Sequence, residues 1–179
     1  MLETIKDFFT LEMIYHFANI GVIPLWLLIV FLPSSKITQG LVNNLFIPFI
    51  LALTYGYLAF EQIYPSGTFE NIAKKDPTGV ISNFKQDPIQ VLDNFKLYLG
   101  LDNLMALMDN SLFALIFWIH FLTLSLFLGV WIANDAIKNN IHKFIVFFPL
   151  ILTYFTGPVG LFLYLFLRLL ISHKFKLHD

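Results

Sequence analysis

The sequence predicts an all-α polytopic membrane protein, a bundle of four transmembrane helices with an amphipathic helical segment between the second and the third. Only 13% of the 179 residues are charged, whereas a soluble domain carries about 25%. Four apolar stretches are each long enough to cross a bilayer, which takes roughly 20 residues. The one long polar region separates the second stretch from the third. We therefore expect residues 1–179 to form a single integral membrane domain.

Turn-forming residues define the ends of these stretches. Pro33-Ser34-Ser35 closes the first, and Tyr64-Pro65-Ser66-Gly67 closes the second. The fourth contains 24 residues without a charge, from Phe144 to Leu167, so we expect one continuous helix there. The four expected helices cover residues 11–32, 41–63, 112–139 and 144–172.

The loop at residues 64–110 has two halves. The first is rich in proline, glycine and serine, which favour turns. The second has apolar residues at helical spacing: Ile89, Leu92, Phe95, Leu99, Leu104, Leu107 and Met108. This pattern predicts one or two short helices lying on the membrane surface. A helix packed on the end of the bundle fits the pattern equally well.

Lysine and arginine positions predict the orientation, because cytoplasmic loops are enriched in both. With four spans, eight cations share a side with both termini and the long loop, and three (Lys36, Lys138 and Lys143) lie on the other side. We therefore expect both termini and the 64–110 loop to be cytoplasmic, with the protein integral to the cytoplasmic membrane of a bacterium.

Several kinds of site are excluded by composition. A net charge of −1 gives no reason to expect a nucleic-acid partner. The absence of cysteine excludes disulfides, thiolate metal sites and a cysteine nucleophile. The histidine clusters of di-iron membrane enzymes are also missing. We predict no metal and no cofactor; a haem held between His16 and His120 is the alternative.

Ionisable side chains inside membrane helices are rare and usually functional. Imidazole and carboxylate groups can carry protons, so the candidate catalytic residues are His120, Glu61 and Asp135. At ~1.5 Å per residue, Asp135 lies more than ~20 Å from His120 along the third helix, so the two cannot pair. The candidate substrate-binding residues are His16 and Asn19 in the inner half of the first helix, Phe127 and Trp131 on a polar and aromatic face of the third helix, and Tyr164 and Arg168 on an inward-facing stripe of the fourth. His120 shares the face of Phe127 and Trp131, and we expect it to point into the bundle.

Each ionisable candidate also has a structural interpretation. His120 could hydrogen-bond across the bundle to a carbonyl freed by proline. Asp135 could anchor the end of its helix by pairing with Lys36 or Lys138. Small residues let membrane helices approach closely, so the expected helix-packing positions are Ser125, Gly129, Gly157 and Gly160.

Arg168 is the only arginine among 11 cations. A guanidinium group suits a carboxylate or a phosphate better than an ammonium group does. We predict that Arg168 pairs with Glu61, which lies at a similar depth near the end of the second helix. A lipid phosphate, or extension of the side chain to the interface, are the alternatives.

Three segments together resemble a known family. They are Phe17–Trp26 with Pro33 and Thr38, then Trp118–Ala136, then Pro149–Arg168. In order and spacing they are similar to the abscisic-acid-deficient-four-like family of small four-helix membrane proteins. The plant member is required for neoxanthin synthesis, in which a violaxanthin epoxide opens to an allenic alcohol. Where the family usually has an aspartate in the third helix, this sequence has Ser125.

The resemblance implies two classes of function. The first is a membrane enzyme acting on a carotenoid or another isoprenoid lipid. The second is a non-catalytic subunit that binds a lipid or pigment and associates with another membrane protein or with a second copy. Ser125 favours the second class, whereas the polar residues at the inner ends of the helices favour the first. Membrane lipids are expected partners in both.

Overall fold

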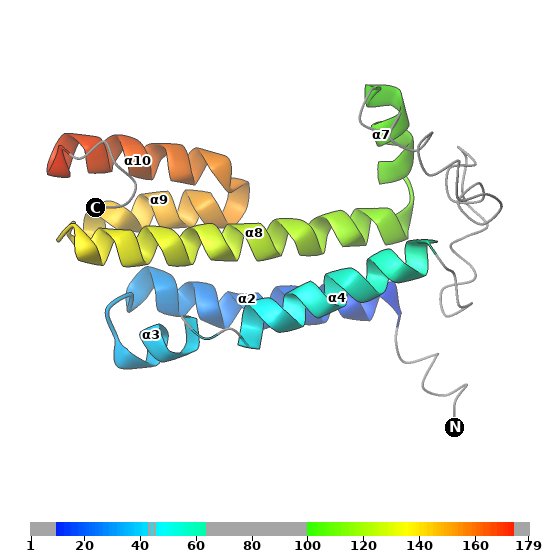
Figure 1. Ribbon diagram of the computed structural model, residues 1–179, viewed down its shortest axis with the longest axis horizontal. Helices are drawn as coiled ribbons and strands as arrows, with labels where there is room; N and C mark the ends of the chain where they lie inside the picture. Colours follow the sequence, from blue (N-terminus) through cyan, green and yellow to red (C-terminus); the bar gives the residue numbers. More distant parts are fainter. Residues whose placement is uncertain (1–9, 43, 45, 64–99, 174–179) are drawn as a thin grey trace. The chain divides into compact units, whose positions relative to one another are not determined.

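The computed structural model describes residues 10–42, 44, 46–63 and 100–173, and these residues contain seven α-helices (Figure 1). The predicted all-α class is confirmed. The chain divides into two compact units. Within the described residues, unit 1 holds the start of α2, α4 from Ala52 onward, α7 and the start of α8. Unit 2 holds the rest of α2 and α8, α4 up to Leu51, and helices α3, α9 and α10.

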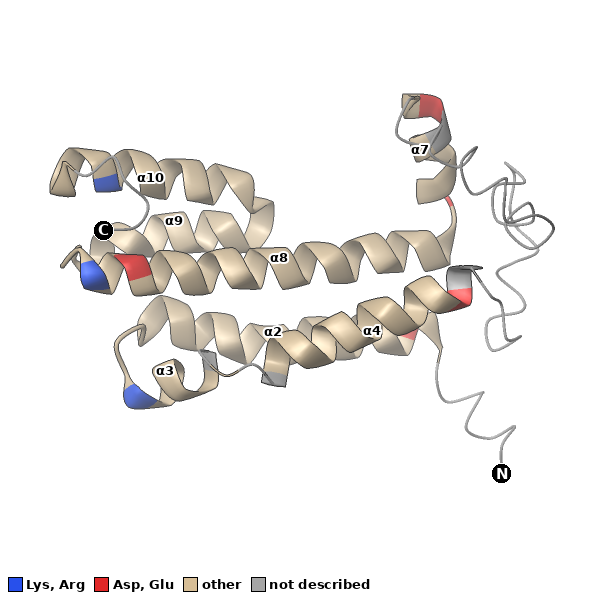
Figure 2. Ribbon diagram, in the orientation of Figure 1, with Lys and Arg blue, Asp and Glu red and all other residues tan. Residues whose placement is uncertain are grey.

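Among the described residues, two helices are long and apolar enough to cross a membrane, α2 (Leu11–Phe31) and α8 (Ser111–Lys138). Their mean hydropathies are 1.9 and 2.2. At ~1.5 Å per residue they measure about 32 and 42 Å, against a hydrocarbon core of about 30 Å. Both agree within one residue with the bounds expected from the sequence. The described charges lie towards the helix ends, leaving the middles of α2 and α8 uncharged (Figure 2).

The second expected helix, 41–63, corresponds to α4 (Phe46–Ile63), and a separate short helix, α3 (Lys36–Val42), precedes it. Helix α3 begins before the expected start because Ser35 caps it. The Thr38 backbone N–H donates to Ser35 Oγ over 3.0 Å, which satisfies one of the free donors at a helix start. The Thr38 hydroxyl also donates to the Leu32 carbonyl over 2.6 Å, and so fixes α3 to the end of α2.

The prediction of one continuous helix over 144–172 is wrong. The chain forms α9 (Lys143–Thr156) and α10 (Pro158–Ser172), which pack along each other as a hairpin (Figure 1). Gly157 has φ +60° and ψ −89°, a backbone conformation that suits glycine. Pro158 follows at the first helical position, where its missing N–H costs nothing. Glycine and proline are common in membrane helices, so the uncharged run gave no sign of this turn.

The ends of α8 are fixed by side-chain and backbone caps. At its start, Asn110 Oδ1 accepts hydrogen bonds from the backbone N–H groups of Leu112 (2.9 Å) and Phe113 (3.0 Å). At its end, Asn140 adopts φ 52° and the Ile141 N–H donates to the Ala136 carbonyl over 2.9 Å. This arrangement closes a helix with a left-handed residue, and it turns the chain into α9.

Helix α7 (Leu101–Met108) lies within the segment predicted to be amphipathic, and exposes Leu101 and Met105. The rest of that segment, residues 64–99, lies outside the described residues. The core of unit 1 is formed by apolar side chains of α4 and α8: Leu58, Leu112, Leu115, Ile116 and Ile119.

Candidate functional site

A buried polar cluster joins α8 to α10 in unit 2. The Tyr164 hydroxyl donates a hydrogen bond to Asp135 Oδ2 over 2.5 Å. Arg168 Nε lies 2.8 Å from the same oxygen. Its N–H is not aligned with that oxygen, so the contact is an ion pair rather than a directed hydrogen bond. The side chains of Arg168 and Asp135 are only 5% and 9% exposed, and Tyr164 is 1% exposed.

The hairpin brings these residues together. The turn at Gly157 lies next to the Phe121 ring of α8, 3.8 Å from where a Cβ on the glycine would be. From there α10 runs alongside α8 in the same direction, so Arg168 reaches the level of Asp135. One continuous helix would have carried Arg168 towards the other end of α8. The hairpin therefore replaces the predicted Glu61 partner of Arg168 with Asp135.

Close backbone packing holds the hairpin in this register. A Cβ on Gly160 would lie 2.2 Å from the Thr153 backbone nitrogen and 2.5 Å from the Pro149 carbonyl oxygen. Thr153 Oγ1 donates to that same carbonyl over 2.8 Å, which satisfies an acceptor in the turn of α9 that contains the proline. Trp131, one turn before Asp135, packs edge-on against Tyr164 with ring centroids 5.9 Å apart. The cluster is thus set in an apolar surrounding.

Such a cluster can stabilise the contact between two helices, and its groups can also transfer protons. In a low-dielectric surrounding, a carboxylate is costly unless it is paired, and here Asp135 has a cation and a hydroxyl donor on one oxygen. The same three groups form an acid–base unit, since a phenol can donate a proton, a carboxylate can accept one and a guanidinium stabilises negative charge nearby. The sequence interpretation of Asp135 as an anchor for Lys36 or Lys138 does not describe this contact.

A family model described as ABA DEFICIENT 4-like matches residues 13–164. The chain belongs to the ABA DEFICIENT 4-like family. The match includes Asp135 and Tyr164 and ends four residues before Arg168. No curated protein and no solved structure matches the chain.

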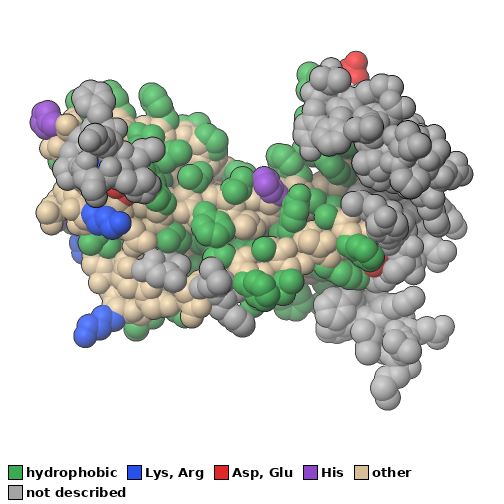
Figure 3. Space-filling model, in the orientation of Figure 1, with side chains coloured by type: hydrophobic (Ala, Val, Ile, Leu, Met, Phe, Trp, Pro, Cys, Tyr) green, Lys and Arg blue, Asp and Glu red, His purple; other side chains and the backbone are tan. Residues whose placement is uncertain are grey.

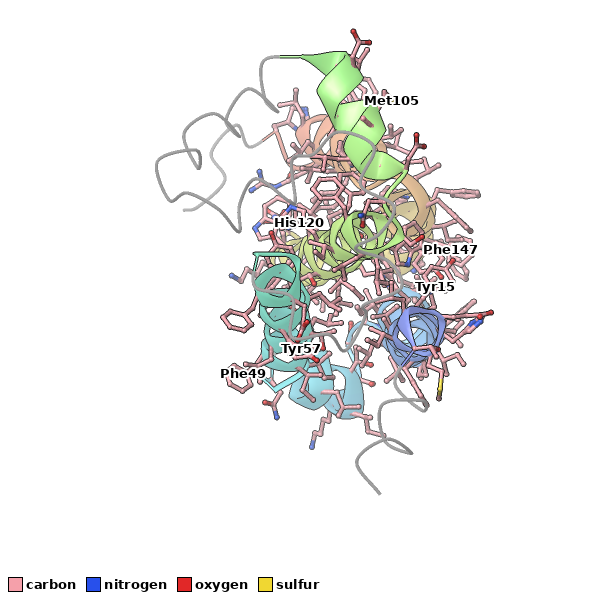
Figure 4. All side chains as sticks on the ribbon, turned by 90° about the vertical axis from the view of Figure 1, so that its right-hand side faces the viewer. Tyr15, Phe49, Tyr57, Met105, His120 and Phe147 are labelled. Atoms are coloured by element: carbon pink, nitrogen blue, oxygen red, sulfur yellow. The ribbon has the colours of Figure 1, made fainter. Side chains whose placement is uncertain are left out.

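The remaining candidates of this ABA DEFICIENT 4-like chain lie in several places. His120 is exposed on α8, with its ring centroid 5.7 Å from that of Tyr55 (His120 is labelled in Figure 4). The expectation that it points into the bundle is therefore wrong. Glu61 is buried in unit 1, near the end of α4. His16 is exposed and lies 3.7 Å from Glu12 one turn earlier, whereas Asn19 is half-buried.

The small residues of α8 are both buried. A Cβ on Gly129 would lie 2.5 Å from the outer edge of the Trp26 ring of α2, so the indole occupies the space that the glycine leaves. Ser125 donates its hydroxyl to the Phe121 carbonyl of its own helix. Its hydroxyl is therefore engaged with the α8 backbone, away from Asp135.

Phe127 lines a shallow apolar hollow of about 50 Å³ in unit 2. Its other walls come from helices α2, α3, α4 and α8: Leu25, Leu41, Ile47, Pro48, Leu126 and Val130. Small-molecule pockets usually measure about 300–1,000 Å³. This hollow is therefore a small surface depression rather than an enclosed ligand pocket.

One polar contact was missed from the sequence. Gln39 Nε2 donates to Asn134 Oδ1 over 3.1 Å and to the Pro33 carbonyl over 2.8 Å. It joins α3 to the end of α8. The residues are 95 positions apart, and no local pattern connects them. Gln39 lies in the polar connection between the first two expected helices, where a polar side chain is ordinary.

Proposed function

We propose that this family member binds a carotenoid-like or other isoprenoid lipid in the membrane and acts on it by proton transfer at Asp135, Tyr164 and Arg168. The observation that supports this most strongly is the buried cluster itself. The Arg168 guanidinium and the Tyr164 phenol both contact one oxygen of the Asp135 carboxylate, between apolar helices. A merely structural contact between α8 and α10 could be apolar, and replacing buried ion pairs with apolar groups is often neutral or stabilising.

The groups suit an epoxide-opening isomerisation of the kind that the resemblance to the plant protein implies. Tyr164 would donate its proton to the epoxide oxygen as the carbon–oxygen bond breaks, with Arg168 stabilising the negative charge. The Asp135 carboxylate would accept a proton from the neighbouring carbon. That proton would then pass from Asp135 to Tyr164 along their hydrogen bond and restore both groups. The product is an isomer of the substrate, so no oxidant or reductant is needed.

The lipid would lie outside the helices rather than in a closed cavity. The hollow beside Phe127 is apolar, and Phe127 itself is 51% exposed. A long hydrocarbon chain can rest along such a surface. Because Asp135, Tyr164 and Arg168 are buried, the oxygen-bearing end of the lipid would reach them only when α8 and α10 separate. Much of the visible surface is hydrophobic (Figure 3), in keeping with a protein that meets its ligand in the bilayer.

A non-catalytic role as a lipid- or pigment-binding subunit is the second candidate. It is favoured by Ser125, which stands where the resemblance leads us to expect an aspartate. Because Ser125 bonds to its own helix backbone, it cannot replace a proton-carrying group. In this case the cluster would hold the polar end of the ligand without changing it.

We further propose that the C-terminus and the 64–110 loop face opposite sides of the membrane. The sequence led us to place them on the same side. Helices α9 and α10 are about 21 and 22 Å long at ~1.5 Å per residue, too short to cross the core separately. A hairpin that enters and leaves on one side fits these lengths. Five lysines would then accompany the N-terminus and loop and five would lie opposite (Arg168 is buried), so charge no longer favours either orientation.

The test uses the full chain purified in detergent. Its absorbance spectrum and a mass spectrum of its extracted lipids should show a bound carotenoid or another isoprenoid. Incubation with violaxanthin should yield an isomer of equal mass, and the Tyr164→Phe variant should retain the ligand but lose the conversion. Bound lipid without conversion would support the binding subunit. Absence of any isoprenoid, with no binding of added violaxanthin, would refute both candidates.

A further inference from the structure

We propose that His120 and Tyr55 form a second binding site, which faces the lipid and accepts the hydroxyl or carbonyl oxygen of a membrane-dissolved lipid. Both residues belong to unit 1. The proposal does not depend on the reaction at Asp135, because no residue is shared. It concerns binding alone and involves no covalent step.

Both residues lie deep in their helices. His120 is nine residues after the start of α8, and Tyr55 is nine residues after the start of α4. At ~1.5 Å per residue, each is about 14 Å along its helix. Tyrosine in membrane proteins is enriched at the two interfaces, and long charged side chains reach water only when they lie near helix ends. Neither an interfacial position nor a side chain that extends to water therefore explains why a histidine and a tyrosine lie at this depth.

The two rings lie next to each other on the outer side of the contact between α4 and α8. Their centroids are 5.7 Å apart and their planes are inclined by 44°. Leu58 of α4 and Ile119 of α8, which belong to the core of unit 1, are fully buried. His120 is nevertheless exposed, and Tyr55 is 38% exposed. The His120 and Tyr55 rings therefore lie at the exposed edge of the contact between α4 and α8 rather than in its buried core.

The His120 imidazole and the Tyr55 hydroxyl both need hydrogen-bond partners at this depth. A neutral imidazole has one donor and one acceptor, and a phenol has both in its hydroxyl. Among the described residues, the ring contact with Tyr55 is the only interaction found for the His120 side chain. Polar groups left unpaired in hydrocarbon are costly, and membrane segments rarely expose ionisable groups to lipid. A ligand oxygen between the two rings would satisfy both.

The surroundings favour an amphiphilic lipid as the occupant. Phe117, one turn before His120, is apolar and 49% exposed. The nearest described charged residue of α4, Glu61, is six positions from Tyr55 along the helix and is buried. A neutral polar spot within an apolar surface is complementary to a neutral oxygen on a hydrocarbon skeleton. It is not complementary to a phosphate or another charged headgroup.

The experiment measures the His120 imidazole directly. The full chain, labelled with ¹³C and ¹⁵N at histidine, is placed in lipid nanodiscs and titrated with phytol. The control titration uses phytane, which has the same carbon skeleton without the hydroxyl. We expect saturable shifts of the His120 resonances with phytol and none with phytane. His142 and His173 serve as internal references, and loss of one set of resonances in His120→Gln assigns the signal.

Three variants decide the interpretation. Tyr55→Phe should weaken phytol binding about fivefold, the effect of losing one hydrogen bond, while Tyr57→Phe on the same helix should leave it unchanged. Tyr164→Phe should also leave it unchanged, which separates this site from the proposed reaction. Equal shifts with phytol and phytane, or none with either, would overturn the proposal. So would disulfide-linked dimers of a Phe117→Cys variant of this cysteine-free chain, since a second copy would then cover the pair.

Discussion

Arg168 and Asp135 meet across α10 and α8, with the arginine Nε 2.8 Å from the carboxylate Oδ2 and both side chains less than a tenth exposed. The contact exists because the chain turns back at Gly157. It links the one arginine of the sequence to the one carboxylate near the end of α8.

We predict that removing the charge of either Asp135 or Arg168 destabilises the protein, because the other charge is then buried without a partner. Asp135→Asn and Arg168→Gln should each lower the free energy of unfolding by about 3–5 kcal/mol, the usual cost of breaking a buried pair from one side. The double variant should lose less than the sum. Denaturant unfolding in detergent measures this, with exposed Lys138→Gln as the control. Additive losses would mean that the two charges do not stabilise each other.

Gly160 should tolerate no side chain. In Gly160→Ala the added methyl would lie 2.2 Å from the Thr153 backbone nitrogen, and backbone in a packed hairpin cannot move aside. We expect a loss of about 1–3 kcal/mol, as for overpacked cores. Gly21→Ala is the matched control, because nothing lies within 4 Å of its added methyl. Equal melting temperatures for the two variants would show that the hairpin is packed less closely than described.

Gly129 should respond differently, because its neighbour is a side chain. The added methyl of Gly129→Ala would meet the outer edge of the Trp26 ring at 2.5 Å. Shortening that ring should relieve the clash, so Trp26→Phe combined with Gly129→Ala should be more stable than the sum of the single losses predicts. Thermal unfolding of the four proteins completes the cycle. If the double variant shows the simple sum, the two residues do not touch.

The hairpin predicts a particular membrane topology. Reporter fusions after Asp179 and within Lys74–Asp76 should report opposite sides of the membrane. Alkaline phosphatase and green fluorescent protein, active outside and inside respectively, give complementary signals in a bacterial host. A fusion after Asn140 provides the reference, because it should match the C-terminal fusion. Same-side signals from the first two fusions would favour four full crossings.

The sequence by itself determined the fold class and the two longest helices. Low charge and long apolar runs reflect transfer into lipid, which acts on each segment independently of its neighbours. The bounds of α2 and α8 followed, because Pro33 and the caps at Asn110 and Asn140 act within a few residues. The family resemblance was likewise present in the residues and is confirmed by the match over 13–164.

The tertiary structure decided where the polar residues meet. The expected pairing of Arg168 with Glu61 assumed a straight fourth helix, and one residue with φ +60°, Gly157, reversed its direction. A glycine within an apolar run is compatible with both a helix and a turn, and the close packing of Gly160 against Thr153 fits the turn. His120 shared a helical face with polar and aromatic residues, but periodicity cannot tell a face that meets protein from one that meets lipid. That distinction depends on which helices lie alongside, and therefore on contacts between residues far apart in the chain.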